Sequence, residues 1–253
     1  MNIIDELEWR GAINQQTDAE GLHKLVDKKF ISLYCGIDPT GDSMHIGHLI
    51  PFMILKRFQL AGHHPVILIG GGTGAIGDPS GRTTERVLQT AEQVKHNADS
   101  LTEQMKKLFG EDGSFTMMNN YDWLSKISLL DFLRDYGKLF NINTMLAKDV
   151  VASRLETGIS FTEFSYQILQ SIDYKMLYEK CGVQLQIGGA DQWGNITNGI
   201  ELIRKTNENH EAFGLTIPLM LKADGTKFGK TESGNVWLDP RYTSPVSYTH
   251  LRA

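Results

Sequence analysis

The stretch YCGIDPTGDSMHIGH, residues 34–48, decides how this chain folds around it. It continues the apolar run 30–34, which is typical of a buried strand, through a turn rich in Asp, Pro, Thr and Gly into a helical pattern. His45 and His48 stand three residues apart at the helix start and therefore share one helix face. Gly47 between them leaves bare backbone that a flat ring can approach. Because free N–H groups at a helix start attract anions, the stretch predicts a polyphosphate site with room for a base.

Outward from this stretch, short apolar runs alternate with longer amphipathic ones. The apolar runs predict strands at 30–34, 66–69, 115–118 and 183–187. The amphipathic runs predict helices at 47–60, 84–108, 129–136, 161–179 and 191–205. This βαβ alternation predicts an α/β fold with a doubly wound parallel sheet.

Glycine-rich or polar segments follow the predicted strands, at 36–41, 70–81, 119–120 and 188–191. Ligands of doubly wound sheets bind outside the carboxyl ends of the strands, so we expect the binding site at these segments.

The composition is that of an ordinary globular protein. The 253 residues are enough for a sizeable core, with 41% hydrophobic and 22% charged side chains. A net charge of −5 argues against a protein that binds DNA or another nucleic acid by bulk charge, so such contacts need local basic patches. Cys35 and Cys181 suggest no disulfide framework, which favours a reducing cytoplasm. We find no signal-peptide core and no apolar run near the ~20 residues that span a membrane.

Segment 70–81 leaves two interpretations open. It lacks the Gly-Lys-Ser/Thr ending of a P-loop, but Gly72-x-Gly74-x-x-Gly77 after a strand matches a dinucleotide-binding pattern. That pattern needs an acidic residue at a strand end about 20 residues on, and Glu92 lies in a helix-like stretch instead. A dehydrogenase motif and a plain glycine turn are equally supported. The histidines near Cys35 lack the spacing of a zinc site, so we expect no tightly bound metal.

Four ordered motifs carry a resemblance. They are HIGH at 45–48, FTEFSYQILQ at 161–170, GGADQWGN at 188–195 and KFGKT at 227–231. One H-x-G-H alone is weak, but this set resembles the bacterial tyrosyl-tRNA synthetases of class I. The resemblance implies a Rossmann-like catalytic domain over 1–245 with a helical insertion at about 127–158 that helps to form a homodimer. Residues 246–253 match nothing expected there. We expect them to be poorly ordered with few core contacts, and the anticodon-binding and C-terminal RNA-binding domains to be absent.

The resemblance also implies an activity and its residues. ATP, as Mg-ATP, activates L-tyrosine to tyrosyl-adenylate, and the tyrosine passes to tRNA(Tyr). The implied tyrosine-binding residues are Tyr34, Asp78, Tyr166, Gln170, Asp173 and Gln192. The implied ATP-binding residues are Cys35, Gly36, Asp38, Gly47, His48, Gly189, Asp191 and Lys230. The candidate catalytic residues, which stabilise charge on the phosphates, are Thr40, His45, His48, Arg82, Arg86, Lys227, Lys230 and Thr231.

The residue types suit these roles. A phenol hydroxyl pairs with one acceptor and one donor, which an ionised Asp173 and Tyr34 supply. Tyr166, Gln170 and Asp173 stand at i, i+4 and i+7, one stripe of a helix. A tryptophan-activating relative is the alternative within the class, although an indole offers only a donor. A dehydrogenase domain and a non-catalytic adenine-nucleotide module are the alternatives outside it.

Overall fold

The computed structural model describes residues 2–80, 89–156, 158–221 and 235–250. Within them, six strands form one sheet in the order β1-β6-β5-β2-β3-β4. The strands are β1 (Gln15–Gln16), β2 (Ser32–Ile37), β3 (His64–Ile69), β4 (Thr116–Asn119), β5 (Val183–Gly189) and β6 (Phe213–Ile217). All neighbours pair in parallel except β1, which is antiparallel to β6. The predicted α/β fold with a doubly wound, mostly parallel sheet is therefore confirmed.

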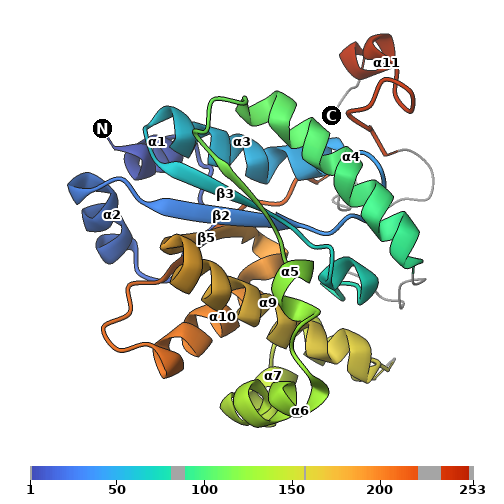
Figure 1. The fold of residues 1–253 in the computed structure, drawn as a ribbon. Helices are drawn as coiled ribbons and strands as arrows, with labels where there is room; N and C mark the ends of the chain where they lie inside the picture. The colour runs from blue at the N-terminus through green and yellow to red at the C-terminus, as the bar shows by residue number, and fades with distance from the viewer. Residues whose placement is uncertain (1, 81–88, 157, 222–234, 251–253) are drawn as a thin grey trace.

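Helices cover both faces of the sheet (Figure 1). One face carries α1 (Ile3–Trp9), α2 (Ala19–Lys28), α3 (Ile46–Leu60) and α4 (Ala91–Phe109). The other carries α5 (Tyr121–Leu124), α9 (Phe161–Cys181) and α10 (Trp193–Thr206). Alternate side chains of the central strands enter two separate hydrophobic cores. Leu33 packs in the core beneath α1–α4, and Tyr34 packs in the core beneath α5, α9 and α10. None of the helices in the described residues is long and apolar enough to cross a membrane.

Two strands were missed by the sequence prediction. β6 reads Phe-Gly-Leu-Thr-Ile, and its Gly214 and Thr216 interrupt the apolar run that marks a buried strand. β1 has two glutamines and no hydrophobic pattern, and it exists because its backbone pairs with Thr216 and Leu215 of β6.

Helix α4 begins later than the predicted 84–108. Residues 84–88 lie outside the described residues, and the helix starts at Ala91. Thr90 is its N-cap: the Thr90 hydroxyl accepts from the Gln93 N–H, and the Gln93 side chain accepts from the Thr90 N–H. This reciprocal capping box fixes the start, since helical periodicity alone does not locate an end.

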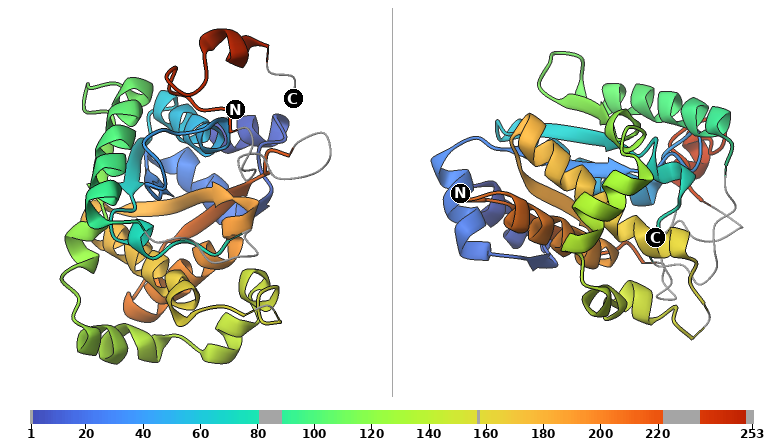
Figure 2. Two further views of the ribbon diagram at one scale, coloured as in Figure 1. Left: turned by 90° about the vertical axis from the view of Figure 1, so that its right-hand side faces the viewer. Right: turned by 60° about the horizontal axis from the view of Figure 1, so that its bottom comes forward.

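The segment around 127–158 contributes no strand to the sheet in the described residues and forms short helices beside α9 (Figures 1 and 2). The predicted helix 129–136 is divided into α6 (Leu129–Asp131) and the π-helical turn η2 (Phe132–Tyr136). The segment continues with η3 (Gly137–Leu139), α7 (Ile142–Leu146) and α8 (Asp149–Ala152). This segment is therefore a series of short helices, each too short to be stable without tertiary contacts.

The last described segment forms α11 (Pro245–Thr249), where we expected poor order. Ser244 caps this helix by accepting from the Ser247 N–H, and Pro245 occupies the first turn, which suits its fixed φ. The helix lies apart from the sheet (Figure 2), and Val246 is 68% exposed. The expectation of few core contacts is met by residues 246–250.

Candidate active site

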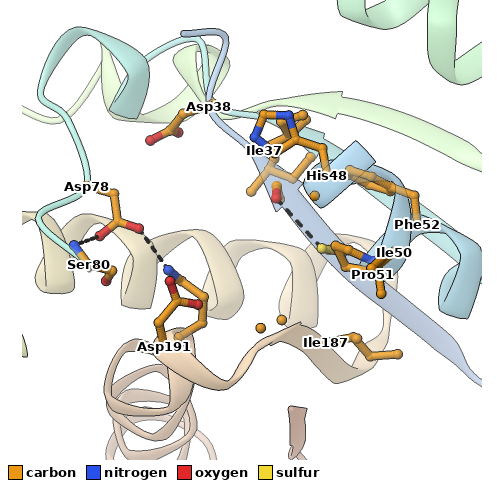
Figure 3. A pocket seen from close by; sticks show the side chains of 18 of the residues that line it. Ile37, Asp38, His48, Ile50, Pro51, Phe52, Asp78, Ser80, Ile187 and Asp191 are labelled. Carbon is orange, nitrogen blue, oxygen red and sulfur yellow. Dashed lines mark hydrogen bonds between the residues drawn. The ribbon is translucent and has the colours of Figure 1, made fainter. Parts of the chain in front are cut away.

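A cavity of about 450 Å³ lies at the carboxyl ends of the parallel strands (Figure 3). From β2 the chain moves to β3 on one side and later to β5 on the other, so the cavity sits at the switch point of the sheet. All fifteen predicted site residues within the described part of the chain line it. They are Tyr34, Cys35, Gly36, Asp38, Thr40, His45, Gly47, His48, Asp78, Tyr166, Gln170, Asp173, Gly189, Asp191 and Gln192. Arg82, Arg86, Lys227, Lys230 and Thr231 lie outside the described residues.

At the inner end of the cavity, Asp173 of α9 is 2% exposed. Its Oδ2 accepts from Asn120 Nδ2 and its Oδ1 accepts from Trp123 Nε1, both at 2.8 Å. Burial raises the pKa of Asp173 to about 7, although the two donors oppose the rise. The carboxyl that we expected to be ionised thus titrates near neutral pH, and a further donor from a ligand would favour its charged form.

Tyr34 of β2 lies against the same wall. Its ring packs on Tyr174 with centroids 5.3 Å apart, and the side chain is 1% exposed. Its hydroxyl is buried without a hydrogen-bond partner among the described residues. Burial and the nearby Asp173 charge raise the pKa of Tyr34 well above its ordinary value, so the hydroxyl keeps its proton. A buried hydroxyl without a partner is costly, and a ligand oxygen in the cavity would remove that cost.

A buried hydrogen-bonded chain supports this wall, and the sequence analysis did not find it. Asn120 Nδ2 also donates to Thr73 Oγ1 at 2.9 Å, and Thr73 Oγ1 donates to Asp38 Oδ1 at 2.7 Å. Tyr166 donates its hydroxyl proton to the other Asp38 oxygen at 2.8 Å. Asn120 directly follows β4 and lies in the predicted strand-end segment 119–120, but nothing in the sequence indicated its bonds to Thr73 and Asp173. The chain fixes Asp38 and Asp173 relative to each other.

Gly70, which follows β3, makes the close packing at Asp38 possible. A Cβ at this position would lie 2.0 Å from Asp38 Oδ1 and 2.5 Å from Thr73 Oγ1. Any larger residue would displace the carboxylate. The 72–77 pattern contains the 3₁₀ turn η1 (Thr73–Ala75), and the described residues 76–80 after it form no helix, so it lacks the context of a dinucleotide fingerprint.

A second polar group surrounds Asp78 (Figure 3). One Asp78 oxygen accepts from the Ser80 N–H and the other from Gln192 Nε2, both at 2.8 Å. Gln170 donates to Gln192 at 3.3 Å and accepts from Asn195 at 3.0 Å. The neutral amides hold the carboxylate in place without adding charge. The predicted stripe of Tyr166, Gln170 and Asp173 lines the cavity from α9, and the Tyr166 hydroxyl donates to Asp38.

The two histidines lie side by side, as their spacing predicted. His45 is the N-cap of α3, and its ring stacks on His48 with centroids 3.6 Å apart. Burial lowers the pKa of His45 to about 4, so the imidazole is neutral at physiological pH. The first turn of α3 also brings Gly47 to the cavity, which Thr40 reaches from the preceding turn. This end of the cavity offers neutral donors at a helix N-terminus, a setting that suits an anion.

The opposite wall comes from β5 and the turn after it. Asp191 lies in the 3₁₀ turn η4 (Ala190–Gln192), and α10 begins at Trp193, so the predicted helix start at 191 was wrong by two residues. A Cβ on Gly189 would come within 2.8 Å of the Asp191 carboxylate. Cys35 is a buried free thiol, and burial raises its pKa to about 12, which makes it unreactive. In the described residues, no group of three His, Cys, Asp or Glu side chains is arranged to hold a metal.

The fold is a doubly wound α/β domain with a polar cavity at the carboxyl ends of its parallel strands. A family model described as tRNA synthetases class I (W and Y) matches residues 27–250, so the chain belongs to this family.

Relatives narrow the similarity further. The chain is 76% identical over 250 residues to tyrosine–tRNA ligase 1 of Enterococcus faecalis, a match that covers 98% of the chain and 60% of the relative. The chain therefore spans about three-fifths of that relative's length. A C-terminally truncated mitochondrial tyrosyl-tRNA synthetase of Aspergillus nidulans superposes with a TM-score of 0.82 at 34% identity, covering 96% of this chain and 73% of the other. The fold is shared with a tyrosyl-tRNA synthetase from Archaeoglobus fulgidus complexed with L-tyrosine, with a TM-score of 0.78 at 19% identity over 100% and 75% of the chains.

Proposed function

We propose that this domain activates L-tyrosine with Mg-ATP, forming tyrosyl-adenylate and pyrophosphate. One observation carries the proposal: the same wall of the cavity presents the Tyr34 hydroxyl, which is buried without a hydrogen-bond partner among the described residues, and the buried Asp173 carboxyl. A phenol hydroxyl donates to Asp173 and accepts from Tyr34, so it satisfies both groups at once. Tyrosine-dependent exchange of pyrophosphate into ATP tests the proposal.

The remaining polar groups fit the rest of the substrates. Asp78, Tyr166, Gln170 and Gln192 form the subsite for the α-ammonium and carboxylate of tyrosine, since one carboxylate among neutral groups suits a cation beside an anion. Cys35, Gly36, Asp38, Gly189 and Asp191 line the space for the nucleoside. Gly47 and His48 complete that space from α3.

The reaction joins a tyrosine carboxylate oxygen to the α-phosphorus and breaks the bond from that phosphorus to the bridging oxygen of pyrophosphate. The attacking carboxylate carries no proton, so the protein needs neither a general base nor a covalent nucleophile. Its contribution is to orient the reactants and stabilise charge on the phosphates. In the described residues, this role falls to Thr40, His45 and His48, which line the cavity. We propose the same role for Arg82, Arg86, Lys227, Lys230 and Thr231.

We further propose that the whole protein transfers tyrosine to tRNA(Tyr) in the cytoplasm and acts as a homodimer. The names of its relatives support the transfer. Exposed apolar side chains on the insertion support the dimer, since a second copy would cover them: Leu129, Leu130, Leu133 and Ile142 are 52–75% exposed. The domain limits 1–245 and the separate status of 246–253 remain predictions.

The family also contains tryptophan-activating enzymes, which is the second candidate. An indole N–H donates and accepts nothing, so it would leave the Tyr34 hydroxyl without an acceptor in the closed cavity. The high identity to tyrosine–tRNA ligases also favours tyrosine.

Replacing Tyr34 with Phe is expected to narrow the preference for tyrosine over phenylalanine by about fivefold, because one neutral hydrogen bond contributes about 1 kcal/mol. The ratio of kcat/KM for tyrosine to kcat/KM for phenylalanine in pyrophosphate exchange measures this preference. Tyr174→Phe is the matched control, since its hydroxyl donates to the backbone carbonyl of Gln184 or Phe213, outside the cavity lining. An unchanged ratio in Tyr34→Phe would remove Tyr34 from the specificity contacts.

Tyrosine affinity is expected to fall as the pH drops below about 7. Only the ionised Asp173 accepts the phenol proton, and its pKa of about 7 in the free site means that protons compete with tyrosine below that pH. The dissociation constant should change little between pH 7.5 and 8 and rise several-fold at pH 6. His45, with its pKa of about 4, does not titrate in this range. Equilibrium dialysis with labelled tyrosine measures the effect, and a constant affinity from pH 6 to 8 would contradict it.

A further inference from the structure

The segment 235–243 lies against the residues that lead into α3. The Ile46 N–H donates to the Val236 carbonyl at 2.9 Å, and the Leu238 N–H donates to the Met44 carbonyl at 2.8 Å. These two bonds flank an isolated antiparallel bridge between His45 and Trp237. The backbone of His45 is therefore held by a segment almost 200 residues later in the sequence.

The His45 ring lies between two other rings. It stacks on His48 with centroids 3.6 Å apart and an interplanar angle of 20°. The Trp237 ring contacts the His45 ring edge to face, with centroids 5.9 Å apart and an interplanar angle of 63°. His45 Nδ1 is buried without a hydrogen-bond partner among the described residues. Ring packing against His48 and Trp237 therefore restrains the plane of the imidazole.

Trp237 is itself fixed from several directions. The backbone N–H of Trp237 donates to Thr243 Oγ1 at 3.0 Å, and the indole ring lies 6.0 Å from the ring of Tyr242. Tyr242 in turn donates to Asp42 at 2.6 Å, next to the turn that leads into α3. Trp237 also lines the cavity, and its ring would contact a Cβ at Gly41 at 3.8 Å. A fixed indole can hold a neighbouring ring in one orientation.

We propose that Trp237 is a positioning residue that holds the His45 imidazole in the orientation in which it meets the phosphates of ATP. The inference rests on the proposed function of the same site, because it assigns His45 to the phosphates. Its consequence is specific: loss of the indole impairs the chemical step through His45 and leaves tyrosine binding intact, since the tyrosine subsite around Asp173 is supported by separate hydrogen bonds.

The test is a double-mutant cycle in the single-turnover rate of tyrosyl-adenylate formation. Trp237→Leu should slow this step about tenfold with the dissociation constant of tyrosine unchanged. In a His45→Ala background, the same change should slow it less than twofold, because the residue through which it acts is gone. Trp237→Phe keeps an aromatic edge and should recover most of the rate. Trp9→Leu is the matched control, since Trp9 is 75% exposed on α1 and should have no effect.

Equal losses from Trp237→Leu in both backgrounds would overturn the proposal, and so would a parallel loss of tyrosine affinity. The His45 ring resonances in a ¹H–¹³C spectrum give a readout that needs no activity. They should shift in Trp237→Leu and return toward the parent position in Trp237→Phe. If the parent protein made no adenylate, the proposed function would fail while this readout still decided the positioning role: unshifted His45 resonances would refute it.

Discussion

Asp173→Asn is expected to lower kcat/KM for tyrosine about 100-fold while the domain stays folded. Both carboxylate oxygens accept hydrogen bonds, one from Asn120 and one from Trp123. An amide replaces one acceptor by a donor, so two donors face each other at a site that is 2% exposed, and the charge that attracts the phenol proton is lost. Losing a buried charge-assisted hydrogen bond costs about 3 kcal/mol, which corresponds to that factor.

Pyrophosphate exchange measures the loss, and thermal unfolding separates it from misfolding. Asp99→Asn is the matched control, because Asp99 pairs with Lys95 on the exposed surface of α4. This variant should change neither kcat/KM in pyrophosphate exchange nor the thermal unfolding temperature. ATP affinity should change much less than tyrosine affinity in the Asp173 variant, since the residues proposed to line the nucleoside space come from β2, β5 and the start of α3 and do not include Asp173. A folded Asp173→Asn protein whose kcat/KM stayed within a few-fold of the parent would contradict the tyrosine subsite proposed here.

His45→Ala is expected to slow adenylate formation by about 10²–10³-fold, which is the usual effect of removing one donor that meets developing charge. Tyrosine affinity should be nearly unchanged, because the imidazole acts on charge that appears late in the reaction. Lys227→Ala, outside the described residues, is expected to behave in the same way. A rapid-quench single turnover gives the rate per bound complex.

His64→Ala is the matched control for this variant. His64 bonds Thr116 between β3 and β4, at the strand ends away from the cavity, so its loss should leave the rate intact. A His45→Ala protein that lost tyrosine affinity but kept its rate per bound complex would show that His45 serves the amino acid and not the phosphates.

The parts of the fold that the sequence predicted are those with a local signal. β2 and β3 are apolar at most positions because they are buried on both faces, and α9 begins and ends at a serine N-cap and a left-handed glycine, Ser160 and Gly182. The sequence prediction missed β1 because this strand forms only by pairing with β6, which lies about 200 residues away in the sequence. Local patterns carry no information on such a partner.

The site also divides into residues with a local sequence signal and residues whose role depends on a distant partner. The predicted site residues followed from motifs and strand ends, and Thr73 and Asn120 also lie in the predicted strand-end segments. The hydrogen bonds that join Thr73, Asn120 and Trp123 to the buried carboxylates were not predicted. Each of these is an ordinary polar or aromatic residue, and its importance arises from a partner on another element: Asn120 meets Asp173 across 53 positions. Trp237 is the extreme case, since nothing around it in the sequence indicates that it packs on His45. Hydrogen bonds and ring contacts between distant elements become visible only in three dimensions.

Tyrosine-dependent ATP–pyrophosphate exchange by this chain decides whether the cavity activates tyrosine. We expect exchange with L-tyrosine at a kcat/KM far above that with L-phenylalanine or L-tryptophan, because only a phenol pairs with both Tyr34 and Asp173. A folded chain that binds ATP but exchanges pyrophosphate equally with all three amino acids, or only with tryptophan, would contradict it.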